Sequence, residues 1–145
     1  MTVSIEVASE ATDELVDAFA RLVPQLSSSS PPPTKEELAA VIGDAGNTVF
    51  IARDGGTVIG TLTLATFRIP TGLRARIEDV VVDEAGRGKR VSEQMNRAAL
   101  DKARELGAKT VDLTSSPSRE AANHIYRQMG FLERDTNVYR MTLDA

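Results

Sequence analysis

The sequence predicts an α/β (α+β) fold with a single mixed, mostly antiparallel central sheet and about four helices. Two observations carry this prediction. Three apolar strand candidates follow one another through the middle of the chain with short turns between them, which makes them antiparallel. A long amphipathic segment then separates the third candidate from a fourth, and a crossover of this kind makes two strands parallel neighbours. We expect the parallel pair at the strands ending near Val82 and Thr114.

Length and composition favour one domain spanning residues 1–145. Hydrophobic residues make up 41% of the chain and charged residues 26%, an ordinary balance for a globular protein. The chain has no cysteine, which excludes a disulfide framework, a Cys-ligated zinc site and a thiol nucleophile. With His124 as the single histidine, we expect no metal site, and a surface position for His124 itself.

Charge and hydropathy bear on location and partners. A net charge of −4 argues against nucleic-acid binding. No window approaches the roughly 18 consecutive apolar residues of a membrane span. Residues 1–7 show no basic region leading into an apolar run, so we expect no secretory signal. These features predict a cytoplasmic protein that binds neither nucleic acid nor a membrane.

The first 45 residues predict one strand and two helices. Val3–Val7 alternates apolar and polar residues, as a half-buried strand does. Thr12 is placed to cap a helix that runs to Leu26 with two acids in its first turn. Ser27–Pro33 is interpreted as a loop, because its prolines remove donors and fix φ. A capping box at Thr34–Glu37 then opens a second helix.

Alternation, turn residues and glycine stops define the later elements. The expected elements are strands at Thr48–Arg53, Thr57–Phe67 and Arg74–Val82, a helix from Val91 to Leu106 stopped by Gly107, a strand at Lys109–Thr114, a helix at Ser118–Met129 stopped by Gly130, and a final extended stretch at Val138–Leu143.

The charged turn Asp83–Arg90 is the most informative segment. It joins the end of a strand to the start of a long helix, where unpaired amides and the helix dipole favour an anion. Arg87, Lys89 and Arg90 add three cations, so the turn suits a pyrophosphate. The alternative is a solvated basic turn without a ligand. The acids Asp83 and Glu84 are interpreted as solvated.

Two motifs in this order resemble the GNAT N-acetyltransferase superfamily. The stretch Val82-Asp83-Glu84-Ala85-Gly86-Arg87-Gly88-Lys89-Arg90-Val91-Ser92 resembles its acyl-CoA loop, which runs Arg or Gln, two residues, Gly, one residue, Gly or Ala. The stretch Ser118–Phe131 resembles its second motif, a helix with Ala122 and Tyr126 four apart that ends in Gly-Phe. The resemblance covers essentially the whole chain and implies the GNAT fold, with the parallel strand pair splayed.

The same resemblance implies acetyl-CoA as the acyl donor and places its contacts. They are backbone groups at Val80, Val81 and Val82, the pyrophosphate loop Arg87, Gly88, Lys89, Arg90, Val91 and Ser92, and Asn123 and Tyr126 along the pantetheine arm. The N–H of Val80 would donate to the thioester oxygen. Tyr126 would protonate the leaving thiolate, with Tyr139 as the less favoured alternative. Arg90 and Ser92 depart from the family, which usually has Gly, and Gly or Ala, at these places.

Glu78 and Asp79 are the candidates for the base that removes the amine proton. Adjacent residues of a regular strand point to opposite faces, and a bulge, which the family often has here, changes that arrangement. Glu78, acting through a water, is the predicted base. The alternative is a structural salt bridge from Glu78 to Arg74 or Arg76.

The predicted function is acetyl transfer from acetyl-CoA to a small-molecule primary amine by direct attack in a ternary complex. Two alternatives stay open at this point: acetylation of a peptide or protein amine, and a non-catalytic sensor or partner-binding module. The replaced glycines favour the module, whereas Asn123 and Tyr126 favour the enzyme. A homodimer is an open expectation, because edge strands near the C-terminus can pair between subunits.

Overall fold

The computed structural model describes residues 3–86 and 90–143. The chain forms two compact units that meet in sequence between Leu113 and Thr114. The first unit contains β1 (Val3–Val7), α1 (Asp13–Leu26), α2 (Lys35–Gly43), β2 (Asn47–Asp54), β3 (Thr57–Ile69), β4 (Gly72–Val82), a 3₁₀ turn (Glu84–Gly86), α3 (Val91–Leu106) and β5 (Val111–Asp112), and the second contains α4 (Glu120–Met129). None of the helices in these described ranges is long and apolar enough to cross a membrane.

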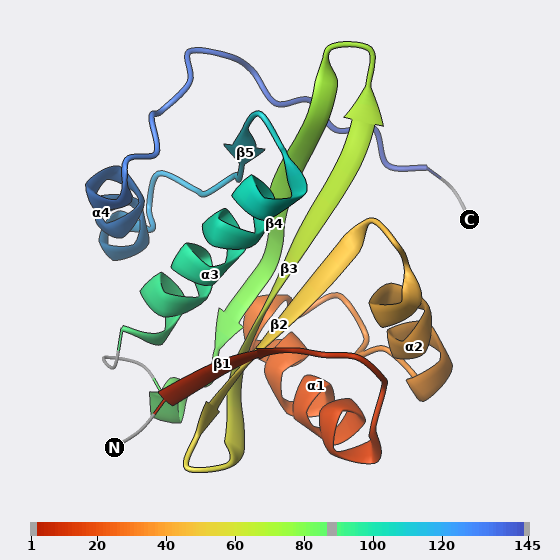
Figure 1. The fold of residues 1–145 in the computed structure, drawn as a ribbon. Helices are drawn as coiled ribbons and strands as arrows, with labels where there is room; N and C mark the ends of the chain where they lie inside the picture. The colour runs from red at the N-terminus through yellow and green to blue at the C-terminus, as the bar shows by residue number, and fades with distance from the viewer. Residues whose placement is uncertain (1–2, 87–89, 144–145) are drawn as a thin grey trace. The chain divides into compact units, whose positions relative to one another are not determined.

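The five strands form one sheet in the order β1-β2-β3-β4-β5 (Figure 1). The first four are antiparallel neighbours, and β5 joins β4 in parallel. The predicted fold class, a mixed and mostly antiparallel sheet with one parallel pair, is therefore confirmed. β5 pairs with β4 at Ala75 and Arg76 alone, so the parallel pairing stops well before β4 ends.

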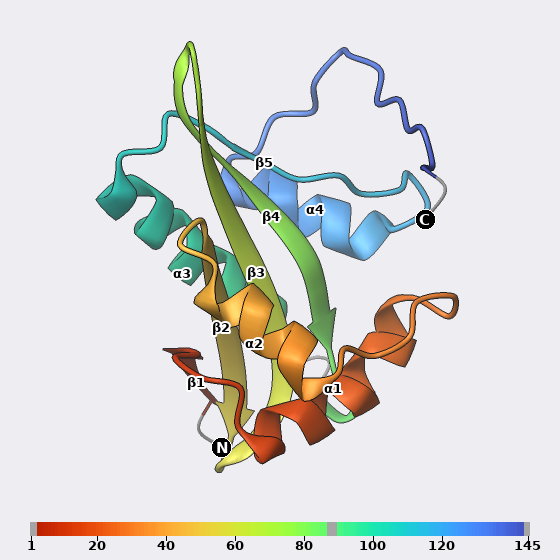
Figure 2. The same cartoon turned by 90° about the vertical axis from the view of Figure 1, so that its right-hand side faces the viewer.

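Helices cover both faces of this sheet within the first unit. Figures 1 and 2 show α3 on one face and α1 with α2 on the other. Alternate residues of the central strands supply the two cores, because successive side chains of a strand point to opposite faces. On the α1 side, Leu22 and Leu38 pack in a cluster with Val49, Ile51 and Val81. The buried face of α3 contributes Val91, Met95, Ala99 and Ala103.

Local signals at the helix ends act as predicted. The hydroxyl of Thr12 accepts a hydrogen bond from the N–H of Leu15. Both bonds of the capping box are present between Thr34 and Glu37, at 3.1 and 2.9 Å. Gly107 and Gly130 end α3 and α4 in the left-handed conformation, with φ of 86° and 103°, which glycine adopts without a side-chain clash.

The structure differs from the prediction at the C-terminal end. No strand forms in the described part of the chain after Met129, and the expected strand at Val138–Leu143 is irregular. Leu132 and Tyr139 are 86% and 88% exposed, so the apolar side chains of this stretch are not packed into the core of their own unit, and a strand without pairing and packing is not stable. β5 is also shorter than the predicted Lys109–Thr114.

Candidate active site

A β-bulge interrupts β4 where the two adjacent acids stand. Thr63 faces Glu78 and Thr61 faces Val81, so two residues of β4, Asp79 and Val80, lie opposite the single residue between the threonines on β3. Asp79 takes a φ of 51°, which is left-handed and unfavourable for a residue with a Cβ. The bulge lets Glu78 and Val81 share one face of the sheet, although a regular strand would separate them.

Glu78 is engaged in an ion pair with its neighbour on the same face. The Nε of Arg76 donates to Oε2 of Glu78 at 3.0 Å, and the two side chains are 35% and 47% exposed. This is one of the two salt bridges that the sequence suggested as an alternative to catalysis. The pair holds the carboxylate of Glu78 along the strand.

Asp79 has the perturbed titration. Burial of its carboxyl group, and next the negative charge of Glu78, raise the pKa of Asp79 above the ordinary value of 3.8. The residue as a whole stays exposed, so the group remains accessible from solvent. A raised pKa and a left-handed backbone at one residue are features that cluster at functional sites.

The edge of β4 beyond its pairing with β5 is the predicted place for the donor. β5 pairs with β4 only at Ala75 and Arg76, so from Ile77 to Val82 the edge of β4 is not paired with β5. Val81 is 5% exposed and belongs to the core with α1, so its predicted contact to the donor would come from its backbone. Val80 and Val82 are half-buried.

The N-terminus of α3 is partly described. Arg87, Gly88 and Lys89, all predicted to bind pyrophosphate, lie outside the described residues. Arg90 is the N-cap, with φ 57° and ψ 28°, and its side chain makes no capping hydrogen bond to the first turn. That side chain is 76% exposed and pairs with Glu93 at 3.4 Å. Val91 is buried, at 2% exposure, and Ser92 is half-buried. Because Arg90 does not cap the first turn with its side chain, the amides of that turn suit an anionic group.

Asn96 is a buried polar residue that the sequence analysis missed. Its Nδ2 donates to the carbonyl oxygen of Ser92 at 2.8 Å, and its Oδ1 is buried without a hydrogen-bond partner among the described residues. The signal available in the sequence was its place between Met95 and Ala99 on the apolar stripe of the helix. A buried amide bonded back to Ser92 stabilises the first turn of α3.

The second unit contains the other predicted donor residues. Asn123 donates from Nδ2 to the carbonyl oxygen of Ser116 at 3.0 Å, so it fixes the segment ahead of α4. Tyr126 is 8% exposed, and its ring meets Phe131 edge-to-face at 5.8 Å. Tyr139 is 88% exposed, and His124 is on the surface as expected. A pocket of about 370 Å³ lies within this unit, lined by Thr114, Ser115, Ser116, Arg119 and Val138.

Among residues 3–86 and 90–143 no group of three or more His, Asp or Glu side chains is placed to hold a metal ion.

Comparisons with known proteins identify the family. A model of the Acetyltransferase (GNAT) family matches residues 12–131. The chain is 33% identical over 142 residues to glucosamine 6-phosphate N-acetyltransferase 1 of Oryza sativa subsp. japonica, covering 86% of this chain and 81% of the relative. It is similar in structure to an aminoglycoside acetyltransferase from an uncultured soil metagenomic sample, with a TM-score of 0.84, 20% identity and coverage of 98% and 97%. Glucosamine-6-phosphate N-acetyltransferase from Arabidopsis thaliana gives a TM-score of 0.81 at 20% identity, with coverage of 97% and 99%.

The chain therefore belongs to the GNAT acetyltransferase family. It is an N-acetyltransferase, and enzymes of this family use acetyl-CoA as the acyl donor.

Proposed function

We propose that the protein transfers an acetyl group from acetyl-CoA to a primary amine of a small molecule, by direct attack of the amine in a ternary complex. The observation that carries the proposal is the course of β4. This strand presents an acid of raised pKa at a bulge, continues beyond its pairing with β5, and precedes in sequence the helix α3, whose N-cap Arg90 makes no side-chain capping hydrogen bond.

The donor would be held mainly by backbone groups. First-turn amides of α3 and the guanidinium of Arg90 suit the pyrophosphate, and β4 amides suit the pantetheine arm. When bound, acetyl-CoA supplies the electrophilic thioester carbonyl. The N–H of Val80 would donate to the carbonyl oxygen and stabilise the negative charge that develops there during attack. Asn123 would contribute from α4 by ordering the segment that includes Ser116.

Asp79 is the better supported base of the two acids. The carboxylate of Glu78 accepts a hydrogen bond from Arg76 at 3.0 Å, so it is engaged as a structural partner on the strand. Burial raises the pKa of Asp79, which makes its carboxylate a stronger base than an ordinary aspartate. We assign Glu78, the base predicted from the sequence, to orienting Arg76 and to raising the pKa of Asp79 by its charge.

The proton transfers balance across two side chains. Asp79 accepts the proton that the amine loses as the C–N bond forms and the C–S bond breaks. Tyr126 donates its phenolic proton to the departing thiolate, giving CoA as the free thiol. The resulting phenolate and carboxylic acid return to their starting states by exchange with solvent.

The acceptor is proposed to be a small polar amine, and amino sugars are the first class to test. The support is the name of the rice relative, which acts on glucosamine 6-phosphate, together with the acids at the bulge, which suit a cationic acceptor. Acetylation of a protein amine is the alternative, because a structurally similar Brucella melitensis protein is a ribosomal-protein-alanine N-acetyltransferase. Cytoplasmic location and a homodimer stay predictions, as does a single domain across the two units.

Calorimetry with acetyl-CoA, followed by thiol-release assays, tests the function. We expect acetyl-CoA to bind, and free thiol to appear with glucosamine, glucosamine 6-phosphate or an aminoglycoside but not with peptides carrying lysine or a free N-terminus. Release with the peptides alone would replace the small acceptor by a protein amine. Absence of acetyl-CoA binding would refute the enzymatic proposal and leave a non-catalytic module.

A matched pair of variants tests the base. Asp79→Asn is expected to lower kcat by about 10²-fold or more, the usual range for a lost general base, and to abolish the acidic limb of the pH–rate profile. Glu78→Gln is expected to lower kcat by less than about tenfold and to keep that limb. The reverse order of effects would return the role to Glu78.

A further inference from the structure

The turn that follows β4 is held from a distance by α1. Asp83 directly follows the strand, and the 3₁₀ turn at Glu84–Gly86 continues from it toward Arg90. We call Asp83–Gly86 the donor turn, because it leads from the proposed thioester site to the proposed pyrophosphate site. Its own backbone is anchored to β3, where the N–H of Asp83 donates to the carbonyl oxygen of Ile59 at 2.7 Å.

Two side chains one helical turn apart on α1 contact the donor turn. Arg21 donates from Nε to Oδ2 of Asp83 at 2.9 Å and from Nη2 to the carbonyl oxygen of Val58 at 2.6 Å. Gln25 uses both ends of its amide: Nε2 donates to Oδ1 of Asp83 at 3.3 Å, and Oε1 accepts from the N–H of Glu84 at 3.1 Å. Gln25 therefore binds both the side chain and the main chain of the turn.

These contacts fix the direction in which the chain leaves β4. The Asp83 side chain is 18% exposed, so its charge is largely shielded and its two bonds are stronger than those of a fully exposed pair. Gly86 closes the turn, with its N–H donating to the carbonyl oxygen of Asp83 at 2.7 Å. A Cβ at Gly86 would lie 3.2 Å from the side chain of Ile59, so the turn rests tightly on β3.

We propose that Arg21 and Gln25 are positioning residues for the acyl donor. By holding the donor turn, these two residues set the position of the amides at the start of α3 relative to the edge of β4. That position matters because the α3 amides and the β4 edge must contact the same molecule of acetyl-CoA. The proposal rests on the proposed function. It adds two residues that lie 62 and 59 positions before the groups they hold.

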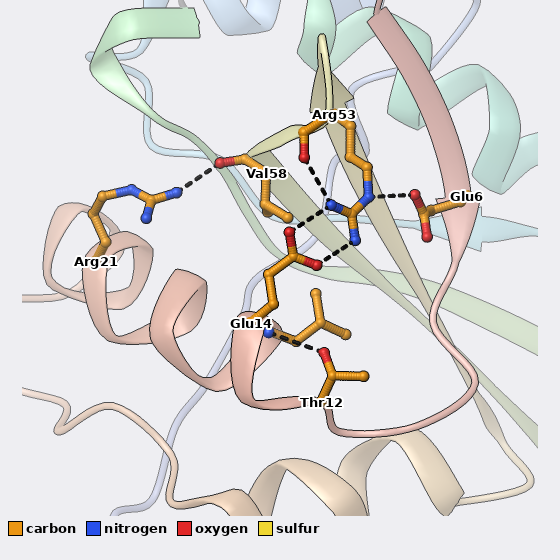
Figure 3. A network of polar contacts seen from close by, with 8 residues as sticks. Glu6, Thr12, Glu14, Arg21, Arg53 and Val58 are labelled. Carbon is orange, nitrogen blue, oxygen red and sulfur yellow. Dashed lines mark hydrogen bonds and ion pairs between the residues drawn. The ribbon is translucent and has the colours of Figure 1, made fainter.

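A separate network shows that α1 does not depend on Gln25 for its attachment. Arg53 donates to both carboxylate oxygens of Glu14 at 2.8 Å and also to Glu6, which joins the start of α1 to β1 and β2 (Figure 3). The hydrogen bond from Arg53 lowers the pKa of Glu14. Leu22, between the two positioning residues, is fully buried. Removing the Gln25 amide should thus loosen the donor turn and leave the helix in place.

The test compares three variants of the whole chain by calorimetry with acetyl-CoA. Gln25→Ala removes both bonds to the turn. Gln25→Glu keeps the shape but places a carboxylate against Asp83. Glu14→Gln is the matched control on the same helix, because it weakens the attachment of α1 without touching the donor turn. Amide hydrogen exchange at Glu84–Gly86, measured without acetyl-CoA, gives a second readout.

We expect both Gln25 variants to raise the Kd for acetyl-CoA about fivefold or more, on the scale of one net hydrogen bond, with kcat at saturating donor within about twofold. Amide exchange at Glu84 should accelerate in Gln25→Ala, which removes the acceptor of that N–H. Glu14→Gln should leave the Kd within about twofold. Three results would each overturn the positioning role and leave the proposed function standing. They are an unchanged Kd for acetyl-CoA in Gln25→Ala, a wild-type Kd in Gln25→Glu, and a rise in Kd in Glu14→Gln equal to that in Gln25→Ala. A wild type that binds no acetyl-CoA would overturn the proposed function, and the positioning role with it.

Discussion

Arg90 is an arginine in a backbone conformation that suits glycine, and Arg90→Gly tests this directly. A residue with a Cβ in the left-handed region costs roughly 1–2 kcal/mol, which glycine avoids. Glycine also raises the entropy of the unfolded chain, an effect worth about 0.4–1 kcal/mol in the opposite direction. The lost pair with Glu93, at 3.4 Å and 76% exposed on the arginine side, is worth little. The balance predicts a gain of about 0.5–1 kcal/mol in the free energy of unfolding.

Arg90→Ala is the matched control for this prediction. Alanine keeps the Cβ and loses the guanidinium, so the difference between the two variants isolates the backbone term. Urea unfolding followed by far-ultraviolet circular dichroism measures both, and a gain of 0.5–1 kcal/mol corresponds to roughly 1–4 °C in Tm for a chain of this size. If Arg90→Gly is less stable than Arg90→Ala, the residue does not occupy the left-handed region in solution and the reasoning fails.

The same two variants separate strain from ligand contact in the proposed donor site. If the guanidinium contacts a phosphate, both variants lose acetyl-CoA affinity about equally, since both lose that group. If the arginine obstructs close approach of the pyrophosphate to the backbone, Arg90→Gly binds more tightly than wild type. Calorimetry distinguishes the two, and the stability data show whether any change in affinity comes with a change in folding.

Three further predictions concern the core, the bulge and the proposed acid. Leu22→Ala, at a fully buried position, should cost about 3–4 kcal/mol in urea unfolding, and a cost below about 1 kcal/mol would contradict its place in the core. Because the pKa of Asp79 is raised in the fold, its ionisation lowers stability as pH rises from near 3.8 through the raised value; Asp79→Asn should therefore gain stability over wild type above that window and none below it, and parallel pH–stability curves would exclude the shift. Tyr126→Phe should lower kcat by about 10²-fold while the Kd for acetyl-CoA stays within about twofold, whereas equal turnover would remove Tyr126 from the mechanism.

The elements that the sequence predicted well are those specified by neighbouring residues. Thr34 and Glu37 make their capping box three residues apart, and Gly107 ends α3 where the apolar stripe ends. The last stretch shows the limit of this reasoning. Val138–Leu143 has the alternation of a strand, but a strand also needs a neighbour to supply hydrogen bonds and a surface, and alternation cannot show whether one is present.

In the candidate site, too, local features could be predicted from the sequence and long-range contacts could not. Glu78 and Asp79 were identifiable as adjacent acids in an apolar strand, and the Arg76 pair was foreseeable because residues two apart share a face. Asp83 was interpreted as solvated, which is wrong: Arg21 and Gln25 bind it from α1. No local pattern could reveal that contact, because it depends on α1 crossing the sheet next to the end of β4.

Strain in the described backbone gathers around one short stretch. Among residues 3–86 and 90–143, Asp79 and Arg90 are the non-glycine residues with a left-handed φ, at 51° and 57°. They flank the donor turn on either side, and each would be more easily accommodated as glycine. Such strain persists only where the surrounding contacts hold it, and here Arg21 and Gln25 hold the turn between the two positions. A fold that needed only a crossover from β4 to α3 would have no reason to keep both conformations, so the two left-handed residues support the proposal that the donor turn between them serves acetyl-CoA binding.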